Sequence, residues 1–229
     1  MLSIVVPTYN EAGSLPTLAE RLHAALGDRD WELIVVDDGS PDGTADIAAG
    51  LAPRIPVRVV RRAGKAGLAS AVVAGFEAAR GDILLVMDAD LSHPPEVVPA
   101  LADAIGGGAE LAVGSRYVPG GGVMDWPFRR RAVSRVACLM GHALVPVRDA
   151  TSGFFAARRS DIEGVKLNPI GFKIGFEVIA RGRYTKVVEV PYTFRDRELG
   201  ASKFGRREIA QYVVQLGQVA RDKLLRRIG

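Results

Sequence analysis

The sequence predicts an α/β fold in which a mostly parallel sheet is flanked by helices. Short apolar, β-rich runs alternate with segments of helical spacing through the first half of the chain. The predicted strands are Ser3–Pro7, Leu33–Asp37, Val57–Arg61, Ile83–Asp88 and Leu111–Ser115. The predicted helices between them are Ser14–Leu26, Thr44–Leu51, Leu68–Arg80 and Pro95–Ile105. Such alternation predicts parallel strands whose carboxyl ends meet at one edge, where the binding sites of α/β proteins gather.

Beyond residue 116 the regular alternation stops. The elements predicted there are a glycine-rich loop, a helix from about Pro127 to Leu144, strands at Ser152–Ala157 and Lys186–Phe194, and a terminal helix from Arg206. We expect one domain over residues 1–205 and a basic amphipathic helix over residues 206–229. The predicted apolar stripe of that helix is Ile209, Val213, Leu216, Ala220 and Leu224. Such a stripe can cover the sheet or lie on a membrane surface.

Charge is distributed unevenly along the 229 residues. The net charge is +4, but residues 195–229 alone carry +5 and the remainder carries −1. Nucleic-acid binding is one explanation of a basic tail, yet neither zinc-finger spacing nor an RNA-binding aromatic signature accompanies it, so we expect no nucleic-acid partner. The single cysteine, Cys138, excludes an intramolecular disulfide and fits a reducing compartment. With no signal peptide or long apolar run visible, we expect a cytoplasmic chain, peripheral on the cytoplasmic face of a membrane.

The stretch Ile83–His93 is the most informative part of the chain, because a buried strand runs directly into Asp88, Ala89 and Asp90. Two carboxylates one residue apart can bridge Mg²⁺ to nucleotide phosphates, since this ion takes one or two carboxylates and completes its shell with phosphate and water. A simple polar turn is the alternative interpretation.

Polar residues also follow the other predicted strands, at Pro7–Glu11, Asp37–Asp42 and Gly114–Arg116. All of these ends are expected at one sheet edge. Neither the glycine turn of dinucleotide oxidoreductases nor a Walker sequence is present, which indicates a nucleotide site of another kind.

These motifs resemble, in this order, those of family 2 glycosyltransferases of the GT-A fold, with its Rossmann-like nucleotide-binding half. The matching segments are Pro7–Glu11, Val36–Ser40, Asp88–Asp90, Gly114–Tyr117, Ser152–Phe155 and Ser202–Lys203, and they cover nearly the whole chain. The resemblance is to dolichol-phosphate mannosyltransferases in particular. It implies inverting transfer of mannose from GDP-mannose to a polyprenyl (dolichyl) phosphate, with Mg²⁺ or Mn²⁺. UDP-glucose or another nucleotide sugar is the alternative donor.

The resemblance also implies roles for individual residues. It assigns the nucleoside to Pro7, Tyr9, Glu11, Val36 and Asp38, the metal to Asp88 and Asp90 with the Ala89 backbone nearby, and the diphosphate or acceptor phosphate to Arg116, Arg197 and Lys203. Relatives often place Gln two residues after the second Asp as a further metal ligand. Ser92 stands there in this chain, followed by His93, so the third ligand is Ser92, His93 or water.

The chemistry of such a transfer needs no general base, because a phosphate monoester is already an anion at pH 7. It needs a metal that stabilises the departing diphosphate, and cations that hold two phosphates together. Asp90, Arg116 and Arg130 are therefore the candidate catalytic residues. Arg130 belongs to a run of three arginines that opposes the dipole of a helix starting at Pro127, so an anion should compensate it.

Two interpretations of this arginine run stay open. It is either a solvated basic patch or a receptor for the acceptor phosphate, formed by Arg116, Arg130 and Ser134. Apolar residues beside it either contact the isoprenoid chain or pack locally; they are Val123, Met124, Trp126 and Phe128. Relatives often continue into membrane-spanning segments, so we expect peripheral docking on the membrane surface or a separate membrane-anchoring subunit or domain.

Overall fold

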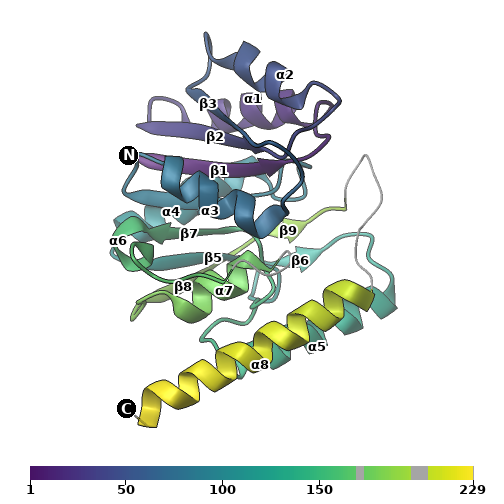
Figure 1. Ribbon diagram of the computed structural model, residues 1–229, viewed down its shortest axis with the longest axis vertical. Helices are drawn as coiled ribbons and strands as arrows, with labels where there is room; N and C mark the ends of the chain where they lie inside the picture. The colour runs from purple at the N-terminus through teal and green to yellow at the C-terminus, as the bar shows by residue number, and fades with distance from the viewer. Residues whose placement is uncertain (169–172, 197–205, 229) are drawn as a thin grey trace.

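The computed structural model describes residues 1–168, 173–196 and 206–228, the last range with side chains from 210 to 225. Within these ranges the central element is a seven-stranded sheet in the order β3-β2-β1-β4-β7-β5-β8 (Figure 1). Its strands are β1 (Leu2–Thr8), β2 (Trp31–Asp37), β3 (Val57–Arg61), β4 (Ile83–Val86), β5 (Leu111–Ser115), β7 (Phe155–Arg158) and β8 (Val187–Pro191). A small second sheet pairs β6 (Gly122–Val123) with β9 (Thr193–Phe194).

The helices confirm the predicted alternation. They are α1 (Leu15–Leu26), α2 (Thr44–Leu51), α3 (Leu68–Ala78), α4 (Val98–Gly106), α5 (Phe128–His142), α6 (Arg159–Ile162), α7 (Ile174–Arg181) and α8 (Arg206–Ile228), with a short 3-10 turn, η1 (Pro95–Val97), before α4. The predicted domain boundary at residue 205 falls beside residues that the structure does not describe.

The large sheet is parallel except for one strand. β3, β2, β1 and β4 pair in parallel, and so do β5 and β8. β7 lies between β4 and β5 and pairs with both in the antiparallel sense. Because β5 therefore points the same way as β4, the carboxyl ends of β1, β2, β4 and β5 share one edge. This confirms the predicted α/β fold with a mostly parallel sheet.

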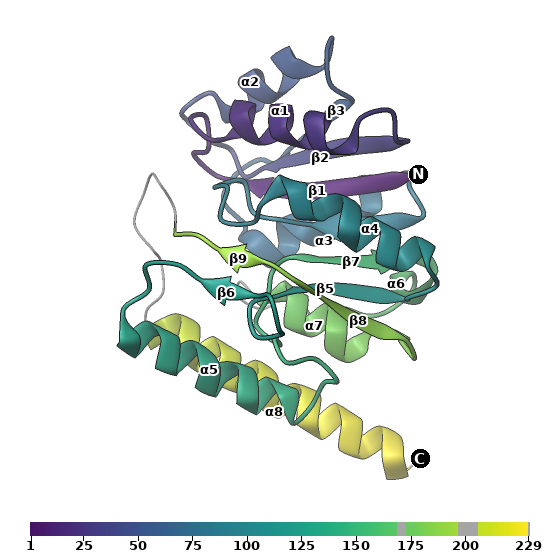
Figure 2. The same ribbon diagram turned by 180° about the vertical axis from the view of Figure 1, so that it is seen from behind.

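Helices cover both faces of the sheet. α1, α2 and α4 pack on one face, and α3 and α7 pack on the other, where residues of α8 join the same cluster (Figures 1 and 2). Side chains alternate accordingly along β1, where Ile4 and Val6 face the first set of helices and Val5 faces the second. Burial on both faces explains why β1 carries consecutive apolar residues, Ile4–Val6, rather than an apolar residue at every second position.

Helices α5 and α8 lie side by side at one end of the sheet (Figures 1 and 2). The Tyr212 hydroxyl donates to the Ala137 carbonyl at 3.1 Å, and the Lys223 ammonium donates to the Leu144 carbonyl. Gly141 permits this close approach, because a Cβ at that position would lie only 2.6 Å from the Tyr212 hydroxyl oxygen. The two helices therefore form one paired surface.

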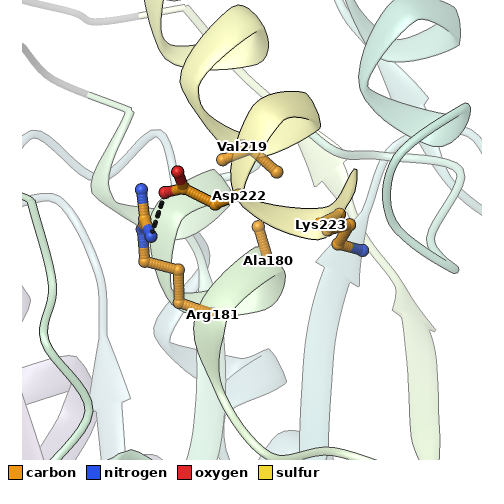
Figure 3. A pocket seen from close by; sticks show the side chains of 5 residues that line it. All are labelled: Ala180, Arg181, Val219, Asp222 and Lys223. Carbon is orange, nitrogen blue, oxygen red and sulfur yellow. Dashed lines mark hydrogen bonds and ion pairs between the residues drawn. The ribbon is translucent and has the colours of Figure 1, made fainter. Parts of the chain in front are cut away.

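An ion pair also fastens α8 to α7. Figure 3 shows Arg181 of α7 reaching Asp222 of α8, and its Nη1 donates to the Asp222 carboxylate at 2.8 Å. Arg181 also pairs with the buried carboxylate of Glu177, which accepts a further hydrogen bond from Gln215 at 3.2 Å. Polar as well as apolar contacts thus fix the position of α8.

The predicted apolar stripe of α8 does not coincide with its buried face. Leu216 and Val219 are buried, but Val213 and Leu224, which were predicted to share the stripe, are 49% and 60% exposed. The side chain of Ile209 lies outside the described residues. The domain covers only a narrow strip of this helix, so apolar residues on its other faces stay at the surface.

Candidate active site

The turn that follows β4 carries Asp88 and Asp90. Asp90 Oδ1 accepts a hydrogen bond from the Ser92 N–H at 3.1 Å, which closes the turn. Leu91, between them, has a φ of 63°. A left-handed conformation costs a residue with a Cβ about 1–2 kcal/mol. Such strain persists only where the surroundings impose it, and it clusters at binding and catalytic sites.

His93 supports this turn through the backbone. Its Nδ1 accepts a hydrogen bond from the Asp88 N–H at 3.0 Å. The ring is buried, stacks on Phe154 with ring centroids 4.9 Å apart, and meets Tyr192 edge-on. Burial lowers the pKa of the imidazole and so favours its neutral form, in which Nδ1 can accept. Because Nδ1 is engaged in this way, the geometry favours Ser92 or water over His93 as a third metal ligand.

The donor set of this turn fits a hard divalent ion. Besides the two carboxylates, the buried Ser92 hydroxyl makes no hydrogen bond to any described residue. The described part of the chain holds no cluster of three or more His, Cys, Asp or Glu side chains that could hold a metal. Mg²⁺ and Mn²⁺ accept such a sparse set of oxygen ligands when substrate phosphates complete the shell. The turn therefore suits a metal that is bound together with a nucleotide diphosphate.

The turns after β1 and β2 are joined to each other. The Asn10 N–H donates to the Ser40 hydroxyl, and the Glu11 N–H donates to the Thr44 hydroxyl, both at 3.0 Å. The first two polar strand ends thus come together at the sheet edge, as the sequence predicts.

Asp38 organises the segment between β3 and α3. One of its carboxylate oxygens accepts from Arg62 Nη1 at 2.7 Å, and the other accepts from the N–H groups of Ala66 and Gly67 at 3.1 and 3.0 Å. This brings a loop rich in basic residues to the same edge as the strand ends. That contribution to the site was not predicted.

The other nucleoside candidates differ in their accessibility. Pro7, Tyr9 and Glu11 are half-buried at the edge, where a ligand can reach them. The Lys65 ammonium lies 4.1 Å from the centre of the Tyr9 ring, a cation–π distance. The side chain of Val36 is instead fully buried in the core, so a nucleoside can meet only its backbone.

Arg116, directly after β5, forms a buried bidentate ion pair with Asp149. Its Nε and Nη2 donate to the two carboxylate oxygens at 2.7 Å each, and Nη2 also donates to the Thr151 hydroxyl at 2.9 Å. Burial opposes the charge on both groups, but their attraction outweighs it, so the pKa of Arg116 is raised and that of Asp149 is lowered. Arg116 is therefore a cation fixed in one orientation.

Two more titratable groups adjoin this ion pair. The Lys173 ammonium donates to the Thr151 carbonyl at 3.1 Å, and desolvation, reinforced by the charge of Arg116, lowers its pKa to about 8. The Cys138 sulfur lies 3.4 Å from the Asp149 carboxylate. Burial raises the pKa of that thiol to about 11, which keeps it protonated and excludes it as a nucleophile at neutral pH.

Arg130, in the first turn of α5, meets an anion within the chain. It forms an ion pair with Asp196, and its guanidinium carbon lies 4.1 Å from the centre of the Trp126 ring. Trp126 is buried and contacts Phe194 of β9 edge-on. The anion that compensates this arginine in the structure is thus the carboxylate of Asp196.

The structure brings the predicted acceptor-phosphate residues into one neighbourhood. The guanidinium of Arg116 also lies against the Trp126 ring, 5.5 Å from its centre, so Trp126 contacts both predicted arginines. The Ser134 hydroxyl accepts a hydrogen bond at 2.8 Å from Tyr117, the residue after Arg116. Arg116 contacts the rings of both Trp126 and Tyr117, and these two rings link it to Arg130 and Ser134.

Two predicted phosphate-contacting residues, Arg197 and Lys203, lie outside the described residues. Sequence reasoning missed Asp149, Lys65 and Lys173. Asp149 could have been found as the one carboxylate in the segment that leads into the Ser152 motif. Nothing in the sequence alone marks the two lysines as part of the site.

A comparison with protein families matches residues 3–171 to the model described as glycosyl transferase family 2. The chain belongs to glycosyl transferase family 2. This confirms the family that the ordered strand-end motifs indicated, and it accounts for their convergence on one sheet edge.

Several curated relatives in this family share much of the sequence. A dolichol-phosphate mannosyltransferase of Pyrococcus furiosus is 49% identical over 93% of this chain, which spans 61% of that relative's length. A polyprenol monophosphomannose synthase of Mycolicibacterium smegmatis is 42% identical, over 94% of this chain and 85% of the relative. A dolichol-phosphate mannosyltransferase of Saccharomyces cerevisiae is 39% identical, over 95% and 86%.

Solved structures share the fold. Glucosyl-3-phosphoglycerate synthase of Mycobacterium tuberculosis, in complex with Mn²⁺, UDP and glucosyl-3-phosphoglycerate, superposes with a TM-score of 0.68 at 23% identity, covering 96% of this chain and 78% of that one. The same enzyme with Mg²⁺ and UDP gives a TM-score of 0.68 at 22% identity, with the same coverage. At this identity the likeness establishes the architecture.

Proposed function

We propose that this family 2 chain transfers mannose from GDP-mannose to a polyprenyl phosphate and inverts the configuration at the anomeric carbon. The observation that carries the proposal is the arrangement of Asp88 and Asp90 on the same sheet edge as the fixed cation Arg116. A carboxylate pair for a metal and a cation for phosphate are what such a transfer needs. The names of the relatives that are 39–49% identical supply the sugar and the class of acceptor.

The donor would bind along the ends of β1, β2 and β4. Pro7, Tyr9 and Glu11 would face the nucleoside, with Asp38 holding the neighbouring loop in place. Asp88 and Asp90 would hold Mg²⁺ or Mn²⁺, which supplies positive charge to the diphosphate leaving group. Their support by the closed turn limits how far the carboxylates must move when the donor binds.

The acceptor would bind on the other side of the sugar. Its phosphate oxygen attacks the anomeric carbon while the bond from that carbon to the GDP oxygen breaks, and GDP departs with the electron pair. Arg116 and Arg130, with the Ser134 hydroxyl, would hold the acceptor phosphate against the repulsion of the donor diphosphate. Binding at Arg130 would then compete with its ion pair to Asp196.

The paired surface of α5 and α8 supports docking on a membrane. Large apolar side chains are exposed on both helices; they are Phe128, Val133, Val136, Leu139 and Met140 of α5, and Val213, Val214, Leu224 and Leu225 of α8. Phe128 is 84% exposed. An exposed apolar patch rimmed by basic residues is typical of a membrane contact.

None of the described helices is long and apolar enough to cross a bilayer. We propose that residues 1–205 carry the reaction. We also propose that the paired surface of α5 and α8 holds the site at the cytoplasmic face of a membrane, alone or with a membrane-anchoring subunit or domain.

The first test of the proposal compares two acceptors. With GDP-mannose as donor, a short polyprenyl phosphate is expected to be mannosylated across neutral pH, because its phosphate needs no deprotonation. The corresponding free polyprenol is expected to be inert, because the proposed mechanism uses no general base to activate an alcohol. Radiolabelled mannose extracted with the lipid measures both reactions. Mannosylation of the free alcohol would contradict the base-free mechanism.

A second prediction separates acceptor binding from donor binding. Arg130→Ala should reduce kcat/KM for polyprenyl phosphate by roughly tenfold to a hundredfold, the equivalent of one charge-assisted hydrogen bond of about 1.5–3 kcal/mol. GDP-mannose affinity, measured by calorimetric titration, should hardly change. Arg129→Ala removes the neighbouring exposed charge from the same helix turn and serves as the matched control. An equal loss of donor affinity in Arg130→Ala and Asp88→Ala would contradict the two separate subsites.

A further inference from the structure

A cavity of about 600 Å³ opens beside α5, and its lining residues do not come from α8. The side chains on which the argument rests are Arg116, Tyr117, Arg135, Leu139, His142 and Arg148. They come from the segment after β5, from α5 and from the segment before β7. A volume of this size lies within the range of small-molecule sites.

The cavity has an excess of positive charge. Within the described residues, the guanidinium groups of Arg135 and Arg148 form neither an ion pair nor a hydrogen bond with any carboxylate. Arg116 pairs with Asp149 and is already assigned to the acceptor phosphate, so it is not counted here. The nearby acid, Glu189, accepts the backbone N–H of Arg148 at 2.9 Å and that of Asp149 at 3.1 Å. Two guanidinium groups thus remain to bind an anion, and a phosphate matches their planar donor geometry.

The cavity adjoins the residues proposed to hold the acceptor phosphate. Arg116 belongs to both regions, whereas Arg130 and Ser134 do not line the cavity. Tyr117 forms part of its wall, and the Tyr117 hydroxyl donates to the Ser134 hydroxyl at 2.8 Å. An anion in the cavity would be a second ligand beside the acceptor.

The rim of the cavity connects it to the apolar surface of α5. Arg135, Leu139 and His142 are spaced i, i+4 and i+7, so they share one face of the helix. Leu139 lines the cavity and is 70% exposed, and the neighbouring Val136 is exposed as well. The His142 ring is fixed by a 2.9 Å contact with the Val147 carbonyl. A ligand with an anionic head in the cavity could therefore lay an apolar chain along α5.

We propose that this cavity binds the phosphodiester headgroup of an anionic phospholipid, with Arg135 and Arg148 contacting the phosphate and Leu139 contacting the acyl chain. The inference rests on the membrane docking of the proposed function and specifies which lipid supports it. The site would orient the protein on the bilayer so that Arg116, Arg130 and Ser134, the residues proposed to hold the acceptor phosphate, face the lipid.

The test is vesicle binding without substrates. Flotation measures partitioning onto phosphatidylcholine vesicles with and without about one third phosphatidylglycerol, at physiological ionic strength. The variant is Arg135→Ala/Arg148→Ala. The matched control is Arg129→Ala/Arg221→Ala, which removes the same charge from exposed positions on α5 and α8 outside the cavity.

Each variant removes two positive charges, so both lose the same part of the general attraction between basic residues and an anionic surface. We expect the cavity variant to lose at least tenfold more affinity for phosphatidylglycerol vesicles than the control, because it also loses charge-assisted hydrogen bonds. Both variants should bind pure phosphatidylcholine equally. Equal losses of the two variants on phosphatidylglycerol vesicles would overturn the proposal and leave a nonspecific basic surface.

Two further experiments test whether the cavity binds a different ligand. Inorganic phosphate at 10 mM and matched ionic strength should leave wild-type binding unchanged; if it removes the difference between the variants, the cavity is a site for free phosphate and the proposal fails. The kcat/KM for polyprenyl phosphate in neutral detergent should stay near wild type in the cavity variant. A loss as large as that of Arg130→Ala would assign the cavity to the acceptor instead.

The same assays separate membrane docking from the reaction. Wild-type protein that binds neither kind of vesicle would refute membrane docking itself. Wild-type protein that binds vesicles but transfers no mannose would refute only the proposed reaction.

Discussion

Asp90→Asn is expected to reduce turnover by roughly a hundredfold to a thousandfold at saturating metal while the fold stays intact. The substitution keeps the shape of the side chain but removes one of two negative charges that would hold the metal. Losing metal charge from the departing diphosphate removes several kcal/mol of transition-state stabilisation, and each 1.4 kcal/mol corresponds to a factor of ten. Transfer rates at increasing Mg²⁺ and Mn²⁺ concentration measure the effect.

The matched control for this variant is Asp28→Asn. Asp28 is exposed in the turn before β2, at the opposite edge of the sheet, so the same loss of charge should leave turnover unchanged. Thermal unfolding followed by circular dichroism verifies that both variants fold. Near-normal turnover of Asp90→Asn at saturating metal would refute the assignment of the metal to this turn.

Asp149→Ala is expected to lower the free energy of unfolding by about 3–5 kcal/mol. The reason is that the substitution leaves the Arg116 guanidinium buried without a counter-charge, which costs far more than the pair itself contributes. Urea unfolding followed by circular dichroism measures the loss. The variant should also lose transfer activity, because Arg116 no longer has a fixed orientation.

The double variant Arg116→Met/Asp149→Leu separates stability from activity. Replacing both charges by apolar side chains of similar size should restore most of the lost stability, since no buried charge is left unpaired. Activity should stay low, because the cation is gone. A single Asp149→Ala variant within 1 kcal/mol of wild type would contradict the buried ion pair, and an active double variant would contradict a role for Arg116 in the reaction.

Much of the fold could be predicted because the strands are buried on both faces. β1, β2, β4 and β5 each contain a continuous apolar run that leads into polar residues, so their parallel pairing and common edge followed from the sequence. The insertion of β7 could not be predicted. It is a strand as expected, but its antiparallel place between β4 and β5 depends on pairing with strands that lie far away in the sequence.

The site was predictable where chemistry is local. Asp88 and Asp90 stand out because two acids at the end of an apolar strand need a cation. The partner of Arg116 was not predictable, since Asp149 lies 33 positions further along and only the fold brings the two together. The role of His93 was also hidden, because it acts through the backbone N–H of Asp88. The left-handed conformation of Leu91 could not be predicted either, because leucine disfavours that conformation and the sequence gives no indication of it.

The measurement that most directly tests the proposed function is a panel of nucleotide sugars assayed with one short polyprenyl phosphate. GDP-mannose, GDP-glucose, UDP-glucose and UDP-galactose would be supplied at equal concentration with Mg²⁺ or Mn²⁺, and the glycolipid product would be identified by mass spectrometry and its anomeric configuration by NMR. We expect efficient transfer from GDP-mannose alone, with the configuration inverted. Preferential transfer from UDP-glucose, or a product that retains the donor configuration, would contradict the proposed function.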